Sequence, residues 1–192
     1  MNIRSQLRKE VRQRRNALSV TQQHNASIAL TERLSTHNKI QQAKRIAIYL
    51  SNDGELSTKD FIDWCWLNNK EVYLPVVHPF SPGNLLFLHY RPETKLISNI
   101  YGILEPLLDV TKVSPLAQLD IICTPLVAFD ETGARLGMGG GFYDRSLVHW
   151  QQTKLYPLGL AHDCQRVAQV PVESWDIPLP EIITPNKNYL FI

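Results

Sequence analysis

The chain has 192 residues, of which 44% are hydrophobic and 20% are charged. This composition is typical of a globular protein, and it excludes a disordered chain, a coiled coil and a collagen-like repeat. At about 100–200 residues per domain, the length predicts one domain over residues 1–192. The three cysteines have no C-x-x-C or zinc-binding spacing, which favours reduced thiols in a cytoplasmic protein.

The net charge of +2 is too balanced to indicate nucleic acid binding by itself. Residues 1–18 nevertheless carry a net charge of +5, so the rest of the chain carries −3. A basic segment on a mildly acidic body favours an anionic partner. The apolar runs, of about five residues, are far shorter than the ~20 needed to span a bilayer. The charged N-terminus also lacks the apolar core of a secretory signal.

The first half of the chain predicts two helices followed by a strand–helix–strand unit. Apolar residues recur at helical spacing over residues 3–18. Ser19 and Gln22 then form a capping-box pattern that opens a second helix to about His37. An apolar strand over residues 45–50 ends in the turn cluster 51–54, and a helix over 58–69 leads to a strand at 72–74. This order predicts parallel pairing within a sheet.

The second half predicts further strands at 85–90, 120–123 and 155–161, the second of them central. A glycine-rich loop and a helix over about 142–151 lie between the last two strands. Residues 91–118 are rich in Pro and Leu and predict no regular element. The whole pattern indicates one α/β domain.

Four of the nine glycines lie within residues 137–141, between a strand and the start of a helix. Glycine lets backbone N–H groups approach a ligand closely, and open α/β sheets bind ligands at the carboxyl ends of their strands. The helix start and Arg135 both favour an anion such as phosphate. Neither G-x-x-x-x-G-K-[ST] nor G-x-G-x-x-G is present, so a tight, ligand-free turn is the alternative. Asp144 would offset the helix dipole or hold Mg²⁺ beside bound phosphates.

The run from Thr124-Pro125 through Phe129-Asp130 to Arg135–Arg145 resembles the signature of the 5-formyltetrahydrofolate cyclo-ligase family, also called methenyltetrahydrofolate synthetases. The basic first helix, Tyr49-Leu50-Ser51 with Glu55, Ile103-Leu104-Glu105-Pro106 and Asp176 follow in family order. The resemblance implies a three-layer α/β/α fold with a mostly parallel sheet, similar to ribose-phosphate isomerases and CoA transferases. It also implies ATP- and Mg²⁺-dependent cyclisation of 5-formyltetrahydrofolate to 5,10-methenyltetrahydrofolate, with release of ADP and phosphate after phosphorylation of the formyl oxygen.

The same resemblance assigns roles to residues of this chain. It implies catalytic roles for Arg135 and Tyr143, and magnesium binding by Asp144 and Asp176. The implied ATP contacts are Arg4, Arg8, Arg135, Leu136, Gly137, Met138, Gly139, Gly140, Gly141, Phe142 and Tyr143. The implied folate contacts are Leu50, Glu55, Tyr101, Met138, Gly139, Gly140, Gly141 and Phe142. It further implies a cytoplasmic monomer that binds 5-formyltetrahydrofolate and ATP but no nucleic acid or membrane.

The chain departs from the family pattern at three positions. Arg4 stands where Lys is usual, Met138 stands where Tyr or Arg is frequent, and Gly140 lacks the cationic side chain of some relatives. The alternative for the first helix is a solvated basic face, and this is the expectation for Arg12, Arg14 and Arg15. Glu55 would otherwise be a surface carboxylate, and Asp176 part of an ordinary turn.

Two other functions compete with the cyclo-ligase interpretation. A sugar-phosphate isomerase of related fold would use the loop for a substrate phosphate and need no ATP. A non-enzymatic folate- or nucleic-acid-binding module would rely on the basic first helix and bind in a strongly salt-dependent way. The sequence His162-Asp163-Cys164 contains nucleophile-type residues, but adjacent positions do not assemble a triad, so a loop cluster is expected.

Overall fold

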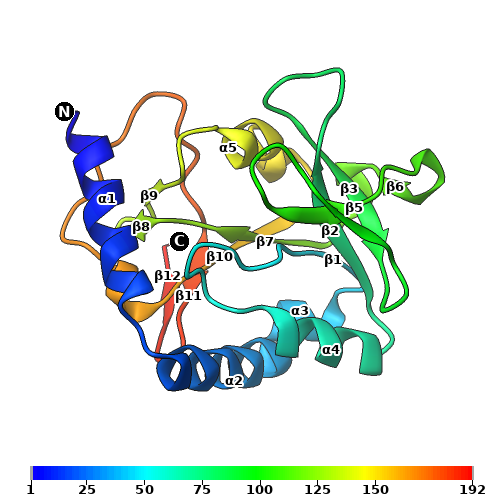
Figure 1. Cartoon of the computed structure of the whole chain (residues 1–192), viewed down its shortest axis with the longest axis horizontal. Coiled ribbons are helices and arrows are strands. Elements are labelled where there is room, and N and C mark those ends of the chain that lie inside the picture. The colour runs from blue at the N-terminus through cyan, green and yellow to red at the C-terminus, as the bar shows by residue number, and fades with distance from the viewer. Residues whose placement is uncertain (1, 192) are drawn as a thin grey trace.

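The computed structural model describes residues 2–191. Its centre is an eight-stranded sheet of order β12-β11-β10-β7-β1-β2-β3-β6 (Figure 1). The strands are β1 (Arg45–Ala47), β2 (Glu71–Val77), β3 (Leu85–Tyr90), β6 (Val113–Ser114), β7 (Ile121–Pro125), β10 (Tyr156–Leu160), β11 (Glu181–Ile183) and β12 (Asn188–Leu190). The five strands from β11 to β2 run parallel, and β12, β3 and β6 add antiparallel edges. The predicted mostly parallel α/β sheet is confirmed.

The predicted strand–helix–strand unit is present as β1, α4 (Lys59–Leu67) and β2. β1 pairs in parallel with β2 on one side and with β7 on the other, which places it in the middle of the sheet. Side chains alternate across the sheet because successive Cβ atoms point to opposite faces. Ile46 and Ile48 therefore join one core cluster and Ala47 the other.

Helices cover both faces of the sheet (Figure 1). α2 (Val20–Thr36), α3 (Asn38–Gln42) and α4 cover one face, where Leu30, Leu34 and Phe61 are fully buried. On the other face the short α5 (Phe142–Leu147) buries Leu147 against the second cluster. α1 (Ile3–Asn16) stands apart from both layers and packs through Val11 on a small hairpin, β8 (Ala128–Phe129) and β9 (Arg135–Leu136). No helix within residues 2–191 is long and apolar enough to cross a membrane.

The capping box at the start of α2 is confirmed. Ser19 Oγ accepts from the Gln22 amide at 3.2 Å, and Gln22 Oε1 accepts from the Ser19 amide at 2.8 Å. These two bonds satisfy backbone N–H groups that have no partner inside the helix. They also fix the sharp change of direction between α1 and α2.

The glycine-rich loop lies somewhat differently from the sequence prediction. It follows β9 of the small hairpin and not a strand of the main sheet. Asp130 stabilises the turn of this hairpin by accepting from the Thr132 amide at 2.9 Å, and it ties the turn to a later segment by accepting from the Val170 amide at 2.7 Å. The helix after the loop ends at Leu147, and a 3₁₀ turn over Trp150–Gln152 replaces its predicted last part.

Three regions depart from the predicted elements. The predicted strand 45–50 keeps ladder pairing only over β1, although the Ile48 amide still donates to Tyr73 O at 2.9 Å. Residues 91–118 contain a hairpin of β4 (Leu96–Ser98) and β5 (Leu104–Pro106), two 3₁₀ turns (Val110–Lys112 and Leu116–Gln118) and β6. The late strands β11 and β12 were not predicted. Strands of two or three residues are too short to show a period-2 pattern.

Candidate active site

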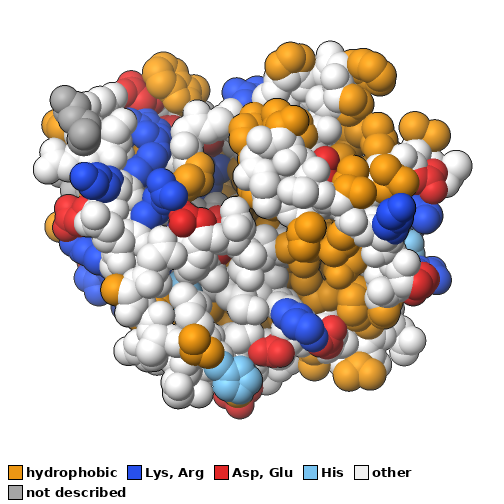
Figure 2. All heavy atoms as spheres, in the orientation of Figure 1, with side chains coloured by type: hydrophobic (Ala, Val, Ile, Leu, Met, Phe, Trp, Pro, Cys, Tyr) orange, Lys and Arg blue, Asp and Glu red, His pale blue; other side chains and the backbone are white. Residues whose placement is uncertain are grey.

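α1 brings two arginines to the glycine-rich loop. Arg4 and Arg8 are one helical turn apart and share a face. The Arg4 guanidinium donates to both carboxylate oxygens of Asp176, at 2.6 and 3.0 Å. Arg8 Nε donates to Gly137 O at 2.8 Å. Positions separated by more than 100 residues in sequence therefore meet beside α1, and Figure 2 shows Lys and Arg side chains gathered there, next to a recess in this face.

Arg135 is the most deeply buried charge beside the loop, with 4% of its side chain exposed. Its side chain extends from β9 and donates through Nη1 to Asp144 Oδ1 at 2.8 Å. The Ile177 amide donates to the same oxygen at 3.1 Å. Within residues 2–191, Arg135 Nε and Nη2 have no hydrogen-bond partner. Buried donors are almost always satisfied in folded proteins. The two free N–H groups therefore indicate a place for an anionic ligand.

The glycine-rich loop presents its backbone rather than its side chains. Gly139 and Gly141 have φ values of +101° and +65°, which favour glycine because a Cβ is strained there. A Cβ on Gly139 would stand 3.6 Å from the Arg8 guanidinium, so the loop and Arg8 face each other. Leu136, just before the loop, is fully buried and anchors it, whereas Met138 is exposed.

Sequence reasoning missed Arg145, which tethers this loop. Its Nε donates to Gly83 O at 2.6 Å, and its Nη2 donates to Gly140 O. The guanidinium also lies 5.8 Å from the centre of the Phe142 ring. Arg145 thus joins the β2–β3 connection to the loop. Arg145 ends the run that resembles the family signature, but nothing in that run indicates that it tethers the loop.

Glu55 follows the carboxyl end of β1, and its charge acts on the nearby Tyr143 hydroxyl. The Glu55 carboxylate accepts from the Asn52 amide at 3.1 Å, and burial raises the pKa of Glu55. Burial and the neighbouring Glu55 charge raise the pKa of Tyr143 far above its usual value. The Tyr143 hydroxyl therefore stays protonated and can act as a hydrogen-bond donor, not as a base. Leu50 packs half-buried against the core at the same strand end.

Tyr101 reaches the site from the β4–β5 hairpin. Its ring meets the Phe142 ring edge-on, with 6.0 Å between ring centres, and 57% of the residue is exposed. Such a geometry is a favourable aromatic pair. The predicted aromatic residue is thus brought next to the glycine-rich loop by the hairpin that sequence reasoning could not resolve.

The two predicted magnesium residues each pair with a separate arginine. Within residues 2–191 there is no cluster of three or more His, Cys, Asp or Glu side chains. Mg²⁺ often takes only one or two carboxylates, with waters and substrate phosphates completing its shell. Asp144 fits this use because its hydrogen bonds within residues 2–191 are both to Oδ1, which leaves Oδ2 for a ligand. Both oxygens of Asp176 accept from Arg4, and although burial opposes ionisation, the Arg4 bond leaves the pKa of Asp176 lowered.

The expectation of a solvated basic face is wrong for Arg15. Arg12 and Arg14 are partly exposed, as expected, but each also pairs with a carboxylate. Arg15 is fully buried, and it donates from α1 to both the carbonyl and the carboxylate of Asp53. Arg12 also pairs with Asp53, and Arg14 pairs with Glu10 on the outer face of α1. Glu10 is already counted in the net charge of +5, and the pairs with Asp53 and Asp176 reduce that charge to +3.

Comparison with known proteins decides the family. The model of the 5-formyltetrahydrofolate cyclo-ligase family matches residues 1–185. The chain belongs to this family. It is 54% identical to the 5-formyltetrahydrofolate cyclo-ligase of Escherichia coli (strain K12), over 92% of this chain and 97% of that protein. It is 52% identical to the Haemophilus influenzae cyclo-ligase, over 94% and 96% of the two chains.

The solved structure of the 5,10-methenyltetrahydrofolate synthetase of Aquifex aeolicus superposes with a TM-score of 0.84 at 28% identity, covering 99% of this chain and 93% of that one. The family assignment and the α/β fold predicted from the sequence are both confirmed, as is the prediction of a ligase. Membership of the cyclo-ligase family replaces the isomerase and binding-module alternatives. The roles predicted for individual residues remain predictions.

Proposed function

We propose that this chain catalyses the ATP- and Mg²⁺-dependent cyclisation of 5-formyltetrahydrofolate to 5,10-methenyltetrahydrofolate, with release of ADP and phosphate. The observation that carries the proposal is the buried Arg135, whose Nε and Nη2 have no partner within residues 2–191. They lie beside a glycine-rich backbone, two further arginines of α1 and a carboxylate. This is the set of groups that phosphoryl transfer needs, because it depends on positioning and charge neutralisation.

The chemistry explains why a nucleotide is required. The formyl oxygen of the substrate is a poor leaving group. Transfer of the γ-phosphoryl group of ATP to that oxygen releases ADP and turns the oxygen into part of a phosphate ester. The folate nitrogen at position 10 then attacks the formyl carbon and loses its proton. The carbon–oxygen bond breaks and phosphate departs, which leaves the methenyl bridge between the two nitrogens.

The residues divide between the two substrates. We assign Arg4, Arg8 and the loop backbone over residues 136–143 to ATP phosphates, and Arg135 to the group being transferred, where its two free N–H groups would stabilise the developing charge. The protonated Tyr143 hydroxyl would donate to the same centre. Glu55 would accept hydrogen bonds from pterin N–H groups, and Leu50, Tyr101 and Phe142 would pack on the folate rings. Mg²⁺ would be held by Asp144 and would neutralise phosphate charge.

Turnover of the purified chain tests the proposal. The protein is mixed with 5-formyltetrahydrofolate, Mg²⁺ and ATP, and the near-ultraviolet absorbance of the methenyl product is followed. The proposal predicts product only when ATP is present, with one ADP formed per product molecule. Product at the same rate without ATP, or no product from folded protein under conditions where a family member is active, would overturn it. The cytoplasmic location and the monomeric state remain predictions.

A further inference from the structure

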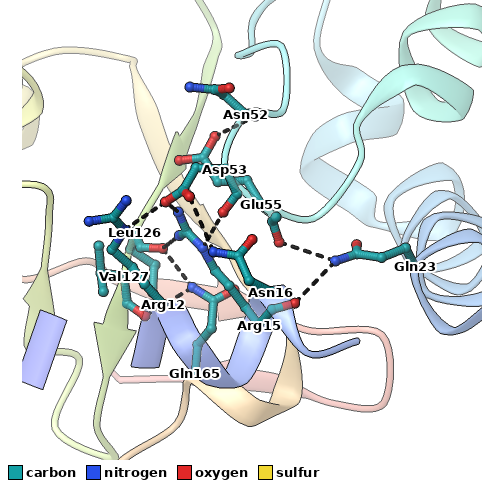
Figure 3. Close-up of polar contacts among 11 residues, drawn as sticks. Arg12, Arg15, Asn16, Gln23, Asn52, Asp53, Glu55, Leu126, Val127 and Gln165 are labelled. Carbon is teal, nitrogen blue, oxygen red and sulfur yellow. Dashed lines mark hydrogen bonds and ion pairs between the residues drawn. The ribbon is translucent and has the colours of Figure 1, made fainter. Parts of the chain in front are cut away.

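A second charged network lies farther along α1 than Arg4 and Arg8, around the turn that follows β1 (Figure 3). The Asp53 carboxylate accepts from Arg12 Nε at 2.7 Å, from Arg15 Nη2 at 2.8 Å and from Asn16 Nδ2 at 3.1 Å. We call these four residues the Asp53 clamp. All three donors belong to α1, so one carboxylate fixes the end of this helix to the turn.

The clamp holds backbone as well as side chains. Arg15 Nε donates to the Asp53 carbonyl at 2.8 Å, and Gln23 Nε2 donates to both Arg15 O and Gly54 O, at 3.4 and 3.3 Å. Arg15 is fully buried, so loss of its carboxylate partner would leave a buried charge without compensation. The contact between α1 and the turn is therefore specific and costly to distort.

The turn that is held carries Glu55. Asp53 and Gly54 are both left-handed, with φ values of +50° and +72°. The Glu55 amide donates back to Asn52 O at 2.9 Å, and the Asn52 amide donates to Glu55 Oε2 at 3.1 Å. The Glu55 side chain is thus oriented by the same turn whose position Asp53 sets. A shift of the turn relative to α1 would move Glu55 with it.

The end of α1 that lies away from the Asp53 clamp carries Arg4 and Arg8. Arg4, Arg8, Arg12 and Arg15 lie on one stripe of α1, because residues three or four apart share a face. Arg12 and Arg15 hold the turn, while Arg8 contacts the glycine-rich loop and Arg4 contacts Asp176. A rigid helix of 14 residues therefore spans from the proposed nucleotide side to the turn of the proposed folate side.

We propose that Asp53 is a positioning residue that sets the geometry between the phosphate-binding arginines of α1 and Glu55, and so aligns the two substrates for phosphoryl transfer. The proposal rests on the proposed function. In-line transfer requires the formyl oxygen and the γ-phosphoryl group to be held close together, and a displacement of about 1 Å far from the chemistry can cost on the order of 100-fold in rate.

The test is Asp53→Asn. Asn tolerates the left-handed backbone at this position, so the change removes the carboxylate charge and its ion pairs with little backbone strain. We expect KM for ATP and KM for 5-formyltetrahydrofolate both to rise, and kcat/KM for each to fall about 10- to 100-fold at a temperature well below unfolding. A merely structural role would reduce only the fraction of folded enzyme, so kcat per folded molecule and both KM values would stay unchanged.

Two controls separate the clamp from general damage. Asp60→Asn removes a carboxylate that accepts from Ser27 Oγ at 2.6 Å and joins α2 to α4 without contacting the Asp53 clamp. Glu10→Gln removes the exposed partner of Arg14 from α1 itself. Both should keep the KM values of the unaltered chain. Unchanged KM values in Asp53→Asn, or the same rise in Asp60→Asn, would overturn the proposal.

A second variant and a binding measurement complete the design. Arg12→Ala removes one half-exposed arm of the clamp, so it should fold and shift both KM values in the same direction by less. Combined with Asp53→Asn it should add little, because both changes remove one interaction. Affinity for a non-hydrolysable ATP analogue, measured by titration, should fall in Asp53→Asn even if the unaltered chain forms no product. Failure of the clamp and failure of the proposed function are thus distinguishable.

Discussion

At the scale of single residues, burial of Arg135 and Glu55 lowers the free energy of unfolding, and packing alone does not explain why these charged residues are there. Arg135 keeps a buried guanidinium with two unused donors, and Glu55 keeps a carboxylate in surroundings that raise its pKa. Such groups are poor choices for stability. Both lie where the proposed substrates meet, so we expect each of them to destabilise the fold and to contribute to binding or catalysis.

Substitution of Arg135 should affect turnover most. Arg135→Lys keeps a positive charge but loses the forked donors, so we expect kcat to fall about 100- to 1000-fold, as for loss of a transition-state donor elsewhere. The measurement is the initial rate of methenyl product formation at saturating ATP and folate. Arg166→Lys, which changes an exposed arginine paired with Glu131, is the matched control. Equal rates in the two variants would exclude the role assigned to Arg135.

Glu55→Gln should separate binding from stability. The raised pKa means that the folded state disfavours the carboxylate, so stability falls as pH rises through the pKa of folded Glu55. At neutral pH the neutral variant should therefore unfold at a higher temperature. Its KM for 5-formyltetrahydrofolate should rise by about tenfold or more, the cost of losing hydrogen bonds to a charged group. A thermal melt at pH 7 and a substrate titration check both statements, and an unchanged KM would contradict the assignment to folate.

At the scale of elements, α1 is attached mainly by ion pairs and hydrogen bonds, and its apolar stripe contributes a small contact through Val11 and Leu7. Only Val11 and Arg15 are buried among its residues. Its attachment depends on Arg4 with Asp176, Arg8 with the glycine-rich loop and the Asp53 clamp. A helix held in this way should respond to pH more strongly than one held by hydrophobic packing.

The Asp53 carboxylate makes that response measurable. Bonds from Arg12 lower the pKa of Asp53 to about 2, although burial opposes the shift. A lowered pKa stabilises the fold at every pH above the pKa of Asp53 in the unfolded chain, which is near 4. This contribution is lost as the pH falls from about 4 toward 2. We expect the unaltered chain to lose at most about 2 kcal/mol more unfolding free energy than Asp53→Asn over this window. Urea unfolding at pH 5 and at pH 2.5 measures the difference, and parallel losses in both proteins would contradict the prediction.

At the scale of the whole molecule, the sheet joins the two halves of the site. β1, β7 and β10 are neighbours, and their carboxyl ends lead to the Asp53 turn, to the β8–β9 hairpin before the glycine-rich loop, and to His162. The late segment then returns through Asp176 and Ile177 to close against Arg4 and Asp144. The site therefore depends on close packing where these segments cross.

Gly159 in β10 tests that packing. A Cβ placed there would stand 2.7 Å from Ile182 Cγ1, 2.8 Å from Leu179 Cδ1 and 3.0 Å from Leu126 Cδ2, which is overpacked. Gly159→Ala should lower the free energy of unfolding by about 1–3 kcal/mol. Gly137→Ala, whose Cβ would meet nothing within 4 Å, should leave stability close to that of the unaltered chain. Denaturant unfolding of the two variants checks the contrast, and a stable Gly159→Ala would show that β10 and β11 can separate without cost.

Local patterns in the sequence by themselves determined several features of this protein. These are the first two helices with their capping box, the parallel β1–α4–β2 unit, the central β7 and the glycine-rich loop. The family motif also marked Arg8, Arg135, Asp144 and Glu55 as candidate site residues. The structural signals each depend on residues within about twenty positions of one another, which is the range over which helical period, capping and turn chemistry act. The family resemblance instead combines short motifs from distant parts of the chain.

Only the tertiary structure decided how the arginines of α1 are used. Arg12 and Arg15 look in sequence like part of a solvated basic face, because nothing local indicates that Asp53 will lie against them. The short strands β4, β5, β11 and β12 likewise have no periodic signal of their own. β4 pairs with β5 and β12 pairs with β11 in short hairpins, and β11 joins the main sheet by pairing in parallel with β10. Burial and charge pairing are properties of segments brought together by folding, so their consequences for the site become visible only in three dimensions.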